Sequence, residues 1–196
     1  GLNLLESLSK KNKLFIILRN RSSKKIFENK NIKIIKFKNY TSLNSQLKKI
    51  KVDIVIHCAT YYVKIHKFSD IKKFCDSNIL LGNIILENLE KMRVKKFINF
   101  STIWENANGK MNNPKNLYSA YKKSFSAILE FYKKKLNDIK FYELMISDTF
   151  GLNDKRKKII NTLKINYRKK KTTKIVSRNL FMNLLNILDI IKAVKL

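Results

Sequence analysis

The feature that most constrains this chain is the alternation of short apolar runs with longer segments of helical periodicity. Leu14–Leu18 is a short and uninterrupted apolar run, which is typical of a strand buried on both faces of a parallel sheet. In Ile71–Met92 and Tyr118–Leu136, apolar residues recur at helical spacing instead. Strands that alternate with helices imply right-handed crossovers, so we predict an α/β fold with a doubly wound parallel sheet.

This reading predicts five strands and five later helices. The strands are Leu14–Leu18, Ile32–Phe37, Asp53–Cys58, Phe97–Phe100 and Phe141–Ile146, and the helices are Ser42–Ile50, Ile71–Met92, Tyr118–Leu136, Ile159–Tyr167 and Leu180–Val194. The alternation stops near Gly151, which predicts one domain over residues 1–150 and a second region over residues 151–196. The chain opens on Gly1 and a leucine-rich helical pattern with nothing before it, so we expect a chain that is truncated.

The net positive charge of the chain is large, but it excludes few classes of function. The 43 Lys and Arg residues against 14 Asp and Glu residues give a net charge of +29, but 37 of the 43 are Lys and they are scattered. A surface that reads nucleic acid usually relies on Arg, so a solvated Lys-rich surface is the simpler interpretation.

The two Cys residues exclude a disulfide framework and a four-thiolate zinc site. Without an apolar run of membrane length or a secretory signal at its start, the chain is expected in the cytoplasm.

The chemistry is expected just after the strands, because ligands of doubly wound sheets bind at the carboxyl ends of the strands. The fourth predicted strand runs into Ser101 and Thr102, and a later helix opens with Tyr118 and Lys122. A spacing of four places Tyr118 and Lys122 on one helix face. A Lys cation near a phenol favours the phenolate, so such a Tyr can exchange a proton with a substrate oxygen.

With these motifs in order, the chain resembles the extended short-chain dehydrogenase/reductases, the NAD-dependent epimerase/dehydratase family. The resemblance rests on six features, which are Gly1 as the last glycine of a phosphate loop, the strand Asp53–Ala59, Asn78 at the start of a helix, the triad Thr102, Tyr118 and Lys122, the Phe150–Gly151 turn, and the segment Ile187–Ala193. It implies a Rossmann-like dinucleotide-binding domain over residues 1–150 that lacks its first strand. Residues 151–196 would then begin a smaller substrate-binding region.

The resemblance also implies roles for individual residues. Thr102, Tyr118 and Lys122 would be catalytic, and no metal is expected. The cofactor would be bound by Gly1, Arg19, Arg21, Ser22, His57, Ala59, Asn78, Lys122 and Asp148, and the substrate by Thr102, Trp104 and Arg156. No acid follows the strand Leu14–Leu18 before Glu28, and Arg19 and Arg21 suit a phosphate, so NADP is predicted in preference to NAD.

A narrower resemblance concerns the segments Phe97–Trp104, Asn113–Ala120 and Asp148–Arg156. They are similar to the nucleotide-sugar 4-keto reductases of the CDP-abequose and CDP-paratose synthase type. The family's dehydratases place Asp-Glu directly after the Thr, whereas this chain has Ile103 and Trp104. We therefore expect an oxidoreductase that reduces a 4-keto group of a nucleotide-linked deoxysugar, of the kind used in O-antigen synthesis.

Other functions stay open at this point. A nucleotide-sugar 4-epimerase uses the same triad, and a Rossmann-like basic protein that binds nucleic acid or regulates would use the charge instead. The chain as given is also compatible with an inactive fragment. As partners we expect a nucleotide sugar and a second copy of the chain, packed through the helices Asn78–Met92 and Tyr118–Leu136, but neither a membrane nor nucleic acid.

Overall fold

The computed structural model describes residues 1–19, 30–151, 154, 158–175, 177, 179 and 181–195. The chain divides into two compact units, Gly1–Met145 and Ile146–Leu196, which are considered separately below. The domain boundary predicted near Gly151, and the absence of a first strand, stay predictions.

The first unit contains two sheets of parallel character. In one sheet β1 (Leu14–Arg19) pairs in parallel with β2 (Ile32–Phe37), with Ile16 opposite Ile34. The other has the order β3–β4–β5, formed by Ile54–His57, Lys96–Thr102 and Lys140–Ile146, and its first pair is parallel. Within the described residues no hydrogen-bonded ladder joins β1 to β3. The predicted parallel α/β architecture is confirmed, with the sheet interrupted between these two strands.

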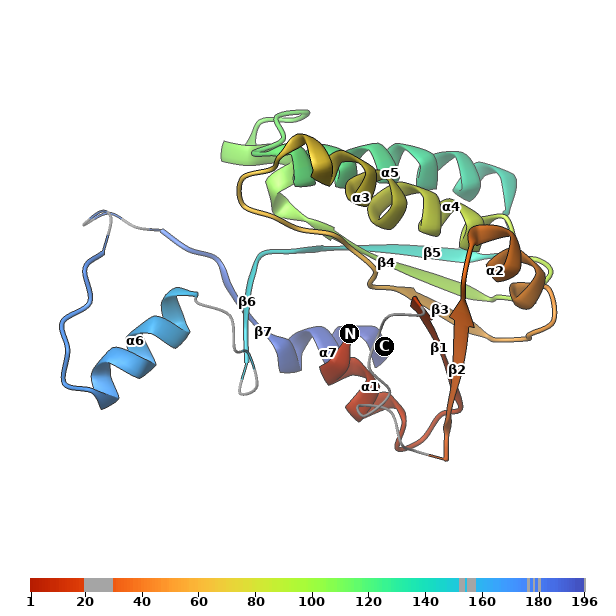
Figure 1. Ribbon diagram of the computed structural model, residues 1–196, viewed down its shortest axis with the longest axis horizontal. Coiled ribbons are helices and arrows are strands. Elements are labelled where there is room, and N and C mark those ends of the chain that lie inside the picture. Colours follow the sequence, from red (N-terminus) through yellow and green to blue (C-terminus); the bar gives the residue numbers. More distant parts are fainter. Residues whose placement is uncertain are drawn as a thin grey trace. The chain divides into compact units, whose positions relative to one another are not determined.

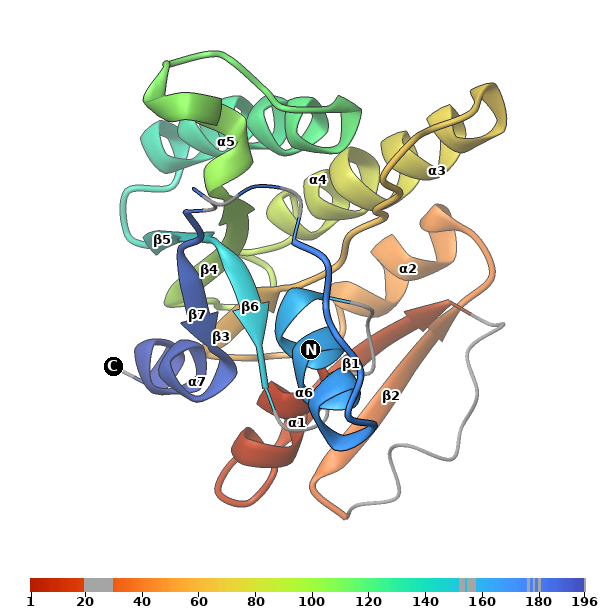
Figure 2. The same ribbon diagram turned by 90° about the vertical axis from the view of Figure 1, so that its left-hand side faces the viewer.

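Helices connect the strands and cover the sheet. They are α1 (Leu2–Leu8), α2 (Tyr40–Leu47), α3 (Ile71–Phe74), α4 (Leu81–Leu86) and α5 (Leu117–Lys135). A π-helical segment, Cys75–Leu80, joins α3 to α4 and widens the helix locally. The helix predicted over Ile71–Met92 is therefore continuous from Ile71, but it ends earlier than predicted, at Leu86. Figure 1 shows α3, α4 and α5 side by side along one face of β3–β4–β5. Figure 2 shows α2 next to α4, on the side of β1 and β2.

The core of this unit lies between the sheet and the layer of α4 and α5. Phe97 of β4 and the α5 residues Phe125 and Leu129 are fully buried there. Gly82 lets α4 approach α5 closely, because a Cβ at this position would lie 2.4 Å from the Phe125 ring and 3.1 Å from His57 Cε1. Close packing of this kind leaves no room for even one added methyl group. It fixes α5 against the end of the sheet where Thr102 lies.

The second unit contains β6 (Asp148–Phe150), α6 (Ile159–Arg168), β7 (Leu184–Asn186) and α7 (Ile187–Lys195). β6 pairs in parallel with β7, with Thr149 opposite Leu185. The prediction of one helix over Leu180–Val194 is wrong for Leu184–Asn186, which form a strand. The apolar spacing continues unbroken from Leu184 into α7, so the pattern alone carried no sign of the pairing with β6. Among the described residues no helix is both long and apolar enough to cross a bilayer.

Candidate functional site

The end of β4 and the start of α5 carry the three predicted catalytic residues. Thr102 is the last residue of β4, and its hydroxyl accepts a hydrogen bond from the backbone N–H of Trp104 (3.3 Å). α5 begins after Asn116, whose side chain accepts from the Ser119 backbone N–H (3.0 Å). The Ser119 hydroxyl accepts from the Asn116 N–H in return (3.0 Å), which completes a capping box. This reciprocal cap fixes the first turn of α5, in which Tyr118 lies.

Lys122 ties α5 to β4. Its side chain is buried, with 3 % of the residue exposed, and the ammonium donates a hydrogen bond to the Phe100 backbone carbonyl at 2.7 Å. Burial lowers the pKa of Lys122, and the acids Glu105 and Glu143, together with the Cys58 thiol, act in the opposite direction. The ammonium is therefore held by a strand carbonyl two residues before Thr102, on the element that carries the proposed carbonyl-binding hydroxyl.

The phenol of Tyr118 lies in an aromatic environment. Its ring makes an edge-on contact with Tyr62 at a centroid distance of 5.1 Å, and Tyr62 in turn approaches Trp104 at 6.1 Å. Burial raises the pKa of Tyr118, a hydrogen bond with Thr60 lowers it, and Glu105 raises it. The sequence-based expectation that Lys122 lowers this pKa is therefore not seen in this structure, because desolvation dominates and the Lys122 ammonium bonds Phe100 instead.

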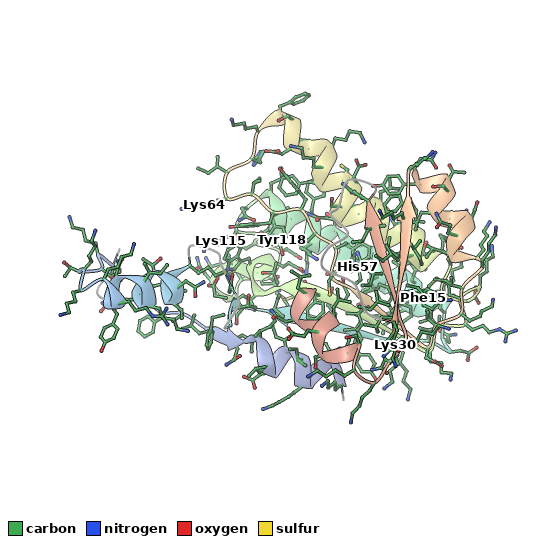
Figure 3. All side chains as sticks on the ribbon, turned by 60° about the horizontal axis from the view of Figure 1, so that its bottom comes forward. Phe15, Lys30, His57, Lys64, Lys115 and Tyr118 are labelled. Atoms are coloured by element: carbon green, nitrogen blue, oxygen red, sulfur yellow. The ribbon has the colours of Figure 1, made fainter. Side chains whose placement is uncertain are left out.

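Trp104 and Lys115 line the site on the side of Tyr62. The Trp104 ring is half-buried, and the Lys115 ammonium lies 4.8 Å from its centroid, a cation–π distance. The Lys115 backbone N–H donates to the Trp104 carbonyl at 3.0 Å, which holds the two residues together. Figure 3 marks Tyr118, Lys115 and His57 among the side chains of the molecule. The assignment of Trp104 to the substrate stays a prediction.

His57 is the last residue of β3 and is 2 % exposed. Its Nδ1 lies 3.0 Å from Asn99 Oδ1, while the Asn99 amide nitrogen donates to Glu143 (2.8 Å). Because Asn99 offers its oxygen to the ring, Nδ1 carries the proton, and the buried Nε2 has no hydrogen-bond partner. Burial lowers the pKa of His57 to about 4, with the Lys122 charge adding to the effect. The imidazole is neutral at pH 7 and packs against Phe97 and Phe125.

Asn78 organises the loop that follows β3. Its side-chain oxygen accepts from the Tyr61 backbone N–H (2.7 Å) and the Thr60 hydroxyl (3.1 Å), and its nitrogen donates to the Tyr61 carbonyl (3.1 Å). Asn78 is 1 % exposed, so all of its side chain serves this loop. Ala59, which precedes the loop, is half-buried. Asn78 therefore acts on any ligand near Ala59 through the backbone it holds.

Gly1 and Arg19 lie at strand ends of the first unit. Burial raises the pKa of the Cys58 thiol, and the positive charges of the Gly1 amino group and Lys122 oppose this, so the Gly1 amino group is near the end of β3. Arg19 is exposed at the end of β1, and its guanidinium donates to the hydroxyls of Ser77 (3.1 Å) and Tyr40 (3.4 Å). The assignment of both residues to a cofactor stays a prediction.

The remaining predicted residues fall in two groups. Asp148 opens β6 in the second unit and is half-buried. Arg21, Ser22 and Arg156 lie outside the described residues. In the described part of the chain, no three His, Cys, Asp or Glu side chains are grouped so that they could hold a metal ion.

Sequence reasoning missed the acids near the triad. Glu105 is 2 % exposed and receives hydrogen bonds from Ser101 and Ser126. Glu143 lies in the middle of the apolar strand β5. The available signals were an acid three residues after Thr102 in a chain with 14 acids, and a charge inside a predicted buried strand.

Known proteins are similar to this chain in sequence. The profile of the NAD dependent epimerase/dehydratase family matches residues 1–196. A CDP-abequose synthase of Yersinia pseudotuberculosis is 28% identical over 156 residues, which are 79% of this chain and 54% of that protein. A dTDP-D-glucose 4,6-dehydratase of Dictyostelium discoideum is 33% identical over 129 residues, 53% of this chain and 30% of that protein. The chain thus spans about half or less of these curated relatives.

Solved structures show the same fold. A UDP-glucuronic acid 4-epimerase from Bacillus cereus, in complex with NAD, superimposes with a TM-score of 0.79 at 18% identity over 100% of this chain and 69% of that one. A UDP-N-acetylglucosamine 4-epimerase from Methanobrevibacter ruminantium gives a TM-score of 0.78 at 20% identity, over 98% and 67% of the two chains. The predicted Rossmann-like fold is therefore confirmed.

The lowered pKa of His57 predicts an acid-dependent loss of stability. In the unfolded chain His57 is protonated near its ordinary pKa of 6.5, whereas in the folded chain it is protonated only near pH 4. Stability therefore falls as the pH falls through this window, by up to about 3 kcal/mol from this group. We expect His57→Gln to lose less stability than the parent between pH 7 and pH 4.5 in urea unfolding. His66→Gln, at an exposed position, is the control. Equal losses in the parent and His57→Gln would contradict the account.

Proposed function

The chain belongs to the NAD dependent epimerase/dehydratase family, and we propose that the protein carrying it reduces the 4-keto group of a nucleotide-linked deoxysugar. The similarity to a CDP-abequose synthase supports this reading, since it covers 79% of the chain. The proposed substrate is a CDP-linked 4-keto deoxysugar, and the reductant is a nicotinamide dinucleotide.

One observation carries the proposal. Thr102 ends β4, Tyr118 and Lys122 lie in the first turns of α5, and the Lys122 ammonium bonds the Phe100 carbonyl of β4 at 2.7 Å. A hydroxyl, a phenol and an ammonium on two rigid elements are the groups needed to bind a carbonyl oxygen and protonate it.

Each residue has a distinct task in this scheme. The Thr102 hydroxyl donates a hydrogen bond to the keto oxygen, and the Tyr118 phenol gives its proton to that oxygen as the carbonyl is reduced. Lys122 supplies positive charge close to the phenol and hydrogen-bonds the nicotinamide ribose. A bound nicotinamide supplies the hydride. The raised pKa of Tyr118 keeps the phenol protonated at neutral pH, which is the form that a proton donor requires.

Two related reactions are less well supported. A 4,6-dehydratase needs further acid–base groups to expel water, and the positions after Thr102 are Ile103 and Trp104. Glu105, the next acid, is buried against Ser101 and does not replace them. The alternative is a nucleotide-sugar 4-epimerase, which uses the same three residues and is represented among the solved structures of this fold. It differs in that the dinucleotide is regenerated within each cycle.

The residues at the strand ends fit a dinucleotide by their chemistry. Arg19 presents a guanidinium at the end of β1, fixed by the Ser77 and Tyr40 hydroxyls, which suits a ribose or its 2′-phosphate. We assign the cofactor further to Gly1, Ala59 and the loop held by Asn78, to His57 at the end of β3, and to Asp148, Arg21 and Ser22. Trp104 and Arg156 are assigned to the sugar nucleotide.

A Tyr118→Phe variant tests the proposed role of the phenol. We expect turnover of the 4-keto sugar to fall by ~10²–10⁴-fold, because a general acid is lost, while the affinity for the dinucleotide is kept. Tyr121→Phe is the matched control, since this neighbouring Tyr stacks on Phe74 and contacts Cys75 instead. Steady-state kinetics and a dinucleotide titration measure both properties. Turnover of Tyr118→Phe near that of the parent would remove Tyr118 from the mechanism.

Arg19→Ala tests the preference for NADPH. We expect the parent to bind NADPH more tightly than NADH, and the variant to lose affinity for NADPH selectively, because a guanidinium binds a 2′-phosphate through charge-assisted hydrogen bonds. Lys49→Ala removes an equal charge from an exposed position and controls for a general electrostatic effect. The measurement is a fluorescence titration with each dinucleotide. Equal affinities in the parent, or a parallel loss of both in Arg19→Ala, would contradict the assignment.

The second copy of the chain is proposed to pack on the α4–α5 layer. Leu80 (39 % exposed), at the end of the π-helical segment that runs into α4, and Phe131 (59 % exposed) on α5 are large apolar residues left uncovered there. We expect the parent to have twice the mass of one chain in light scattering, and Leu80→Lys combined with Phe131→Lys to have the mass of one. Leu163→Lys, on the exposed face of α6, should leave the mass unchanged. A parent with the mass of one chain would contradict the proposal.

A further inference from the structure

A line of polar side chains crosses the apolar interior beneath the site. It begins with His57 on β3, which is hydrogen-bonded to Asn99 on β4. The amide nitrogen of Asn99 donates to Glu143 Oε1 on β5 at 2.8 Å. Ser126 on α5 donates to the same carboxylate oxygen at 2.7 Å and lies 3.4 Å from Glu105 Oε2. The line therefore connects the middle of the sheet to Glu105, which follows β4 directly.

Glu105 closes this line at the catalytic end. Ser101, one residue before Thr102, donates its hydroxyl hydrogen to Glu105 Oε1. The Thr102 backbone N–H also bonds this carboxylate. Glu105, in the turn that follows β4, is thus hydrogen-bonded to the last two residues of that strand. A change in its position would move the Thr102 hydroxyl.

Two acids so close together need a compensating charge. Glu105 is 2 % exposed and Glu143 is half-buried, and one Ser126 hydroxyl hydrogen cannot bond both at once. A buried carboxylate is costly unless it is paired. The buried cation beside them is Lys122, which is 3 % exposed and whose ammonium responds to the charges of both acids. Among the described residues, no acid bonds Lys122 directly, because its ammonium donates to the Phe100 carbonyl.

Other charged or titratable groups face this pair from each neighbouring element. Cys58, which follows β3, also acts on the pKa of Lys122. The Lys122 charge in turn lowers the pKa of His57 at the end of that strand. The Lys123 charge on α5 lowers the pKa of Glu105. The Glu105 charge raises the pKa of Tyr118 on the same helix. Cys58 and His57 are uncharged at pH 7, because burial raises the pKa of the thiol and lowers that of the imidazole. Burial raises the pKa of Glu105, while its hydrogen bond from Ser101 lowers it. Among the described residues, Glu105 and Glu143 are the acids whose charges act on Lys122.

We propose that Glu105 is a positioning residue of this site, which fixes the Ser101–Thr102 strand end and, with Glu143 across Ser126, provides the counter-charge that keeps the buried Lys122 ammonium protonated. The proposal deepens the proposed function and rests on it for the roles of Thr102 and Lys122. The charge pairing itself is a property of the folded chain, and it can be measured without any substrate.

The ammonium of Lys122 gives a direct readout. In ¹H–¹⁵N spectra of the ¹⁵N-lysine-labelled chain, a buried and hydrogen-bonded ammonium exchanges slowly, whereas exposed lysines exchange fast. The signal of Lys122 is the one that Lys122→Arg removes. In a pH titration we expect the midpoint at which it disappears to fall by roughly 1 to 3 pH units in Glu105→Gln, because an opposite charge that acts on the buried ammonium is lost. Glu143→Gln should act in the same direction and provides a second test if Glu105→Gln does not fold.

Two further variants separate charge from packing. Glu105→Asp keeps the charge and should return the midpoint toward that of the parent. Glu130→Gln removes an exposed acid that pairs with Lys133 on α5, and it should leave the midpoint unchanged. In the active enzyme the pH dependence of kcat in Glu105→Gln should shift by the same amount as the ammonium midpoint.

The outcomes separate the two proposals. Midpoints that stay at the parent value in both Glu105→Gln and Glu143→Gln would overturn the counter-charge role, even in an enzyme that reduces its sugar. Midpoints that fall as expected support that role, including in a protein without activity toward nucleotide sugars, in which case the proposed function alone would be wrong.

Discussion

The bond between the Lys122 ammonium and the Phe100 carbonyl is the contact on which the rest of the site depends. It is a charge-assisted hydrogen bond of 2.7 Å in a buried position, and it joins α5 to the strand that ends in Thr102. Removal of the ammonium would leave a buried carbonyl unpaired and two acids without their cation. The geometry of the triad and the stability of its surroundings therefore depend on the same side chain.

The packing around α5 explains why this contact is rigid. Gly82 on α4 permits Phe125 and His57 to fill the space beneath the helix, and the Asn116–Ser119 capping box fixes its first turn. The loop after β3 is held in a similar way by Asn78. Functional side chains that are supported by buried neighbours stay close to one geometry, which is a requirement for proton transfer at a chosen atom.

Much of the fold followed from local patterns in the sequence. The five strands of the first unit were found because each is a short apolar run between helical segments, and Ile32–Phe37 matches its predicted bounds. β7 was missed because its pairing with β6 depends on a segment far away in the chain. In the site, the places of Thr102, Tyr118 and Lys122 were predictable from strand and helix ends. The role of Glu105 was not, because its burial is decided by Ser126 and Glu143 on other elements.

The central claim is that this site transfers a hydride to a keto sugar, with Tyr118 as the proton donor. The most direct measurement uses reduced nicotinamide dinucleotide carrying deuterium at C4 of the nicotinamide, on the transferred face, together with a CDP-linked 4-keto deoxysugar. NMR and mass spectrometry of the product then show where the label goes. The account predicts one deuterium at C4 of the sugar and one dinucleotide oxidised for each sugar reduced. A 4-hydroxy product without deuterium at C4, or turnover without net oxidation of the dinucleotide, would contradict it.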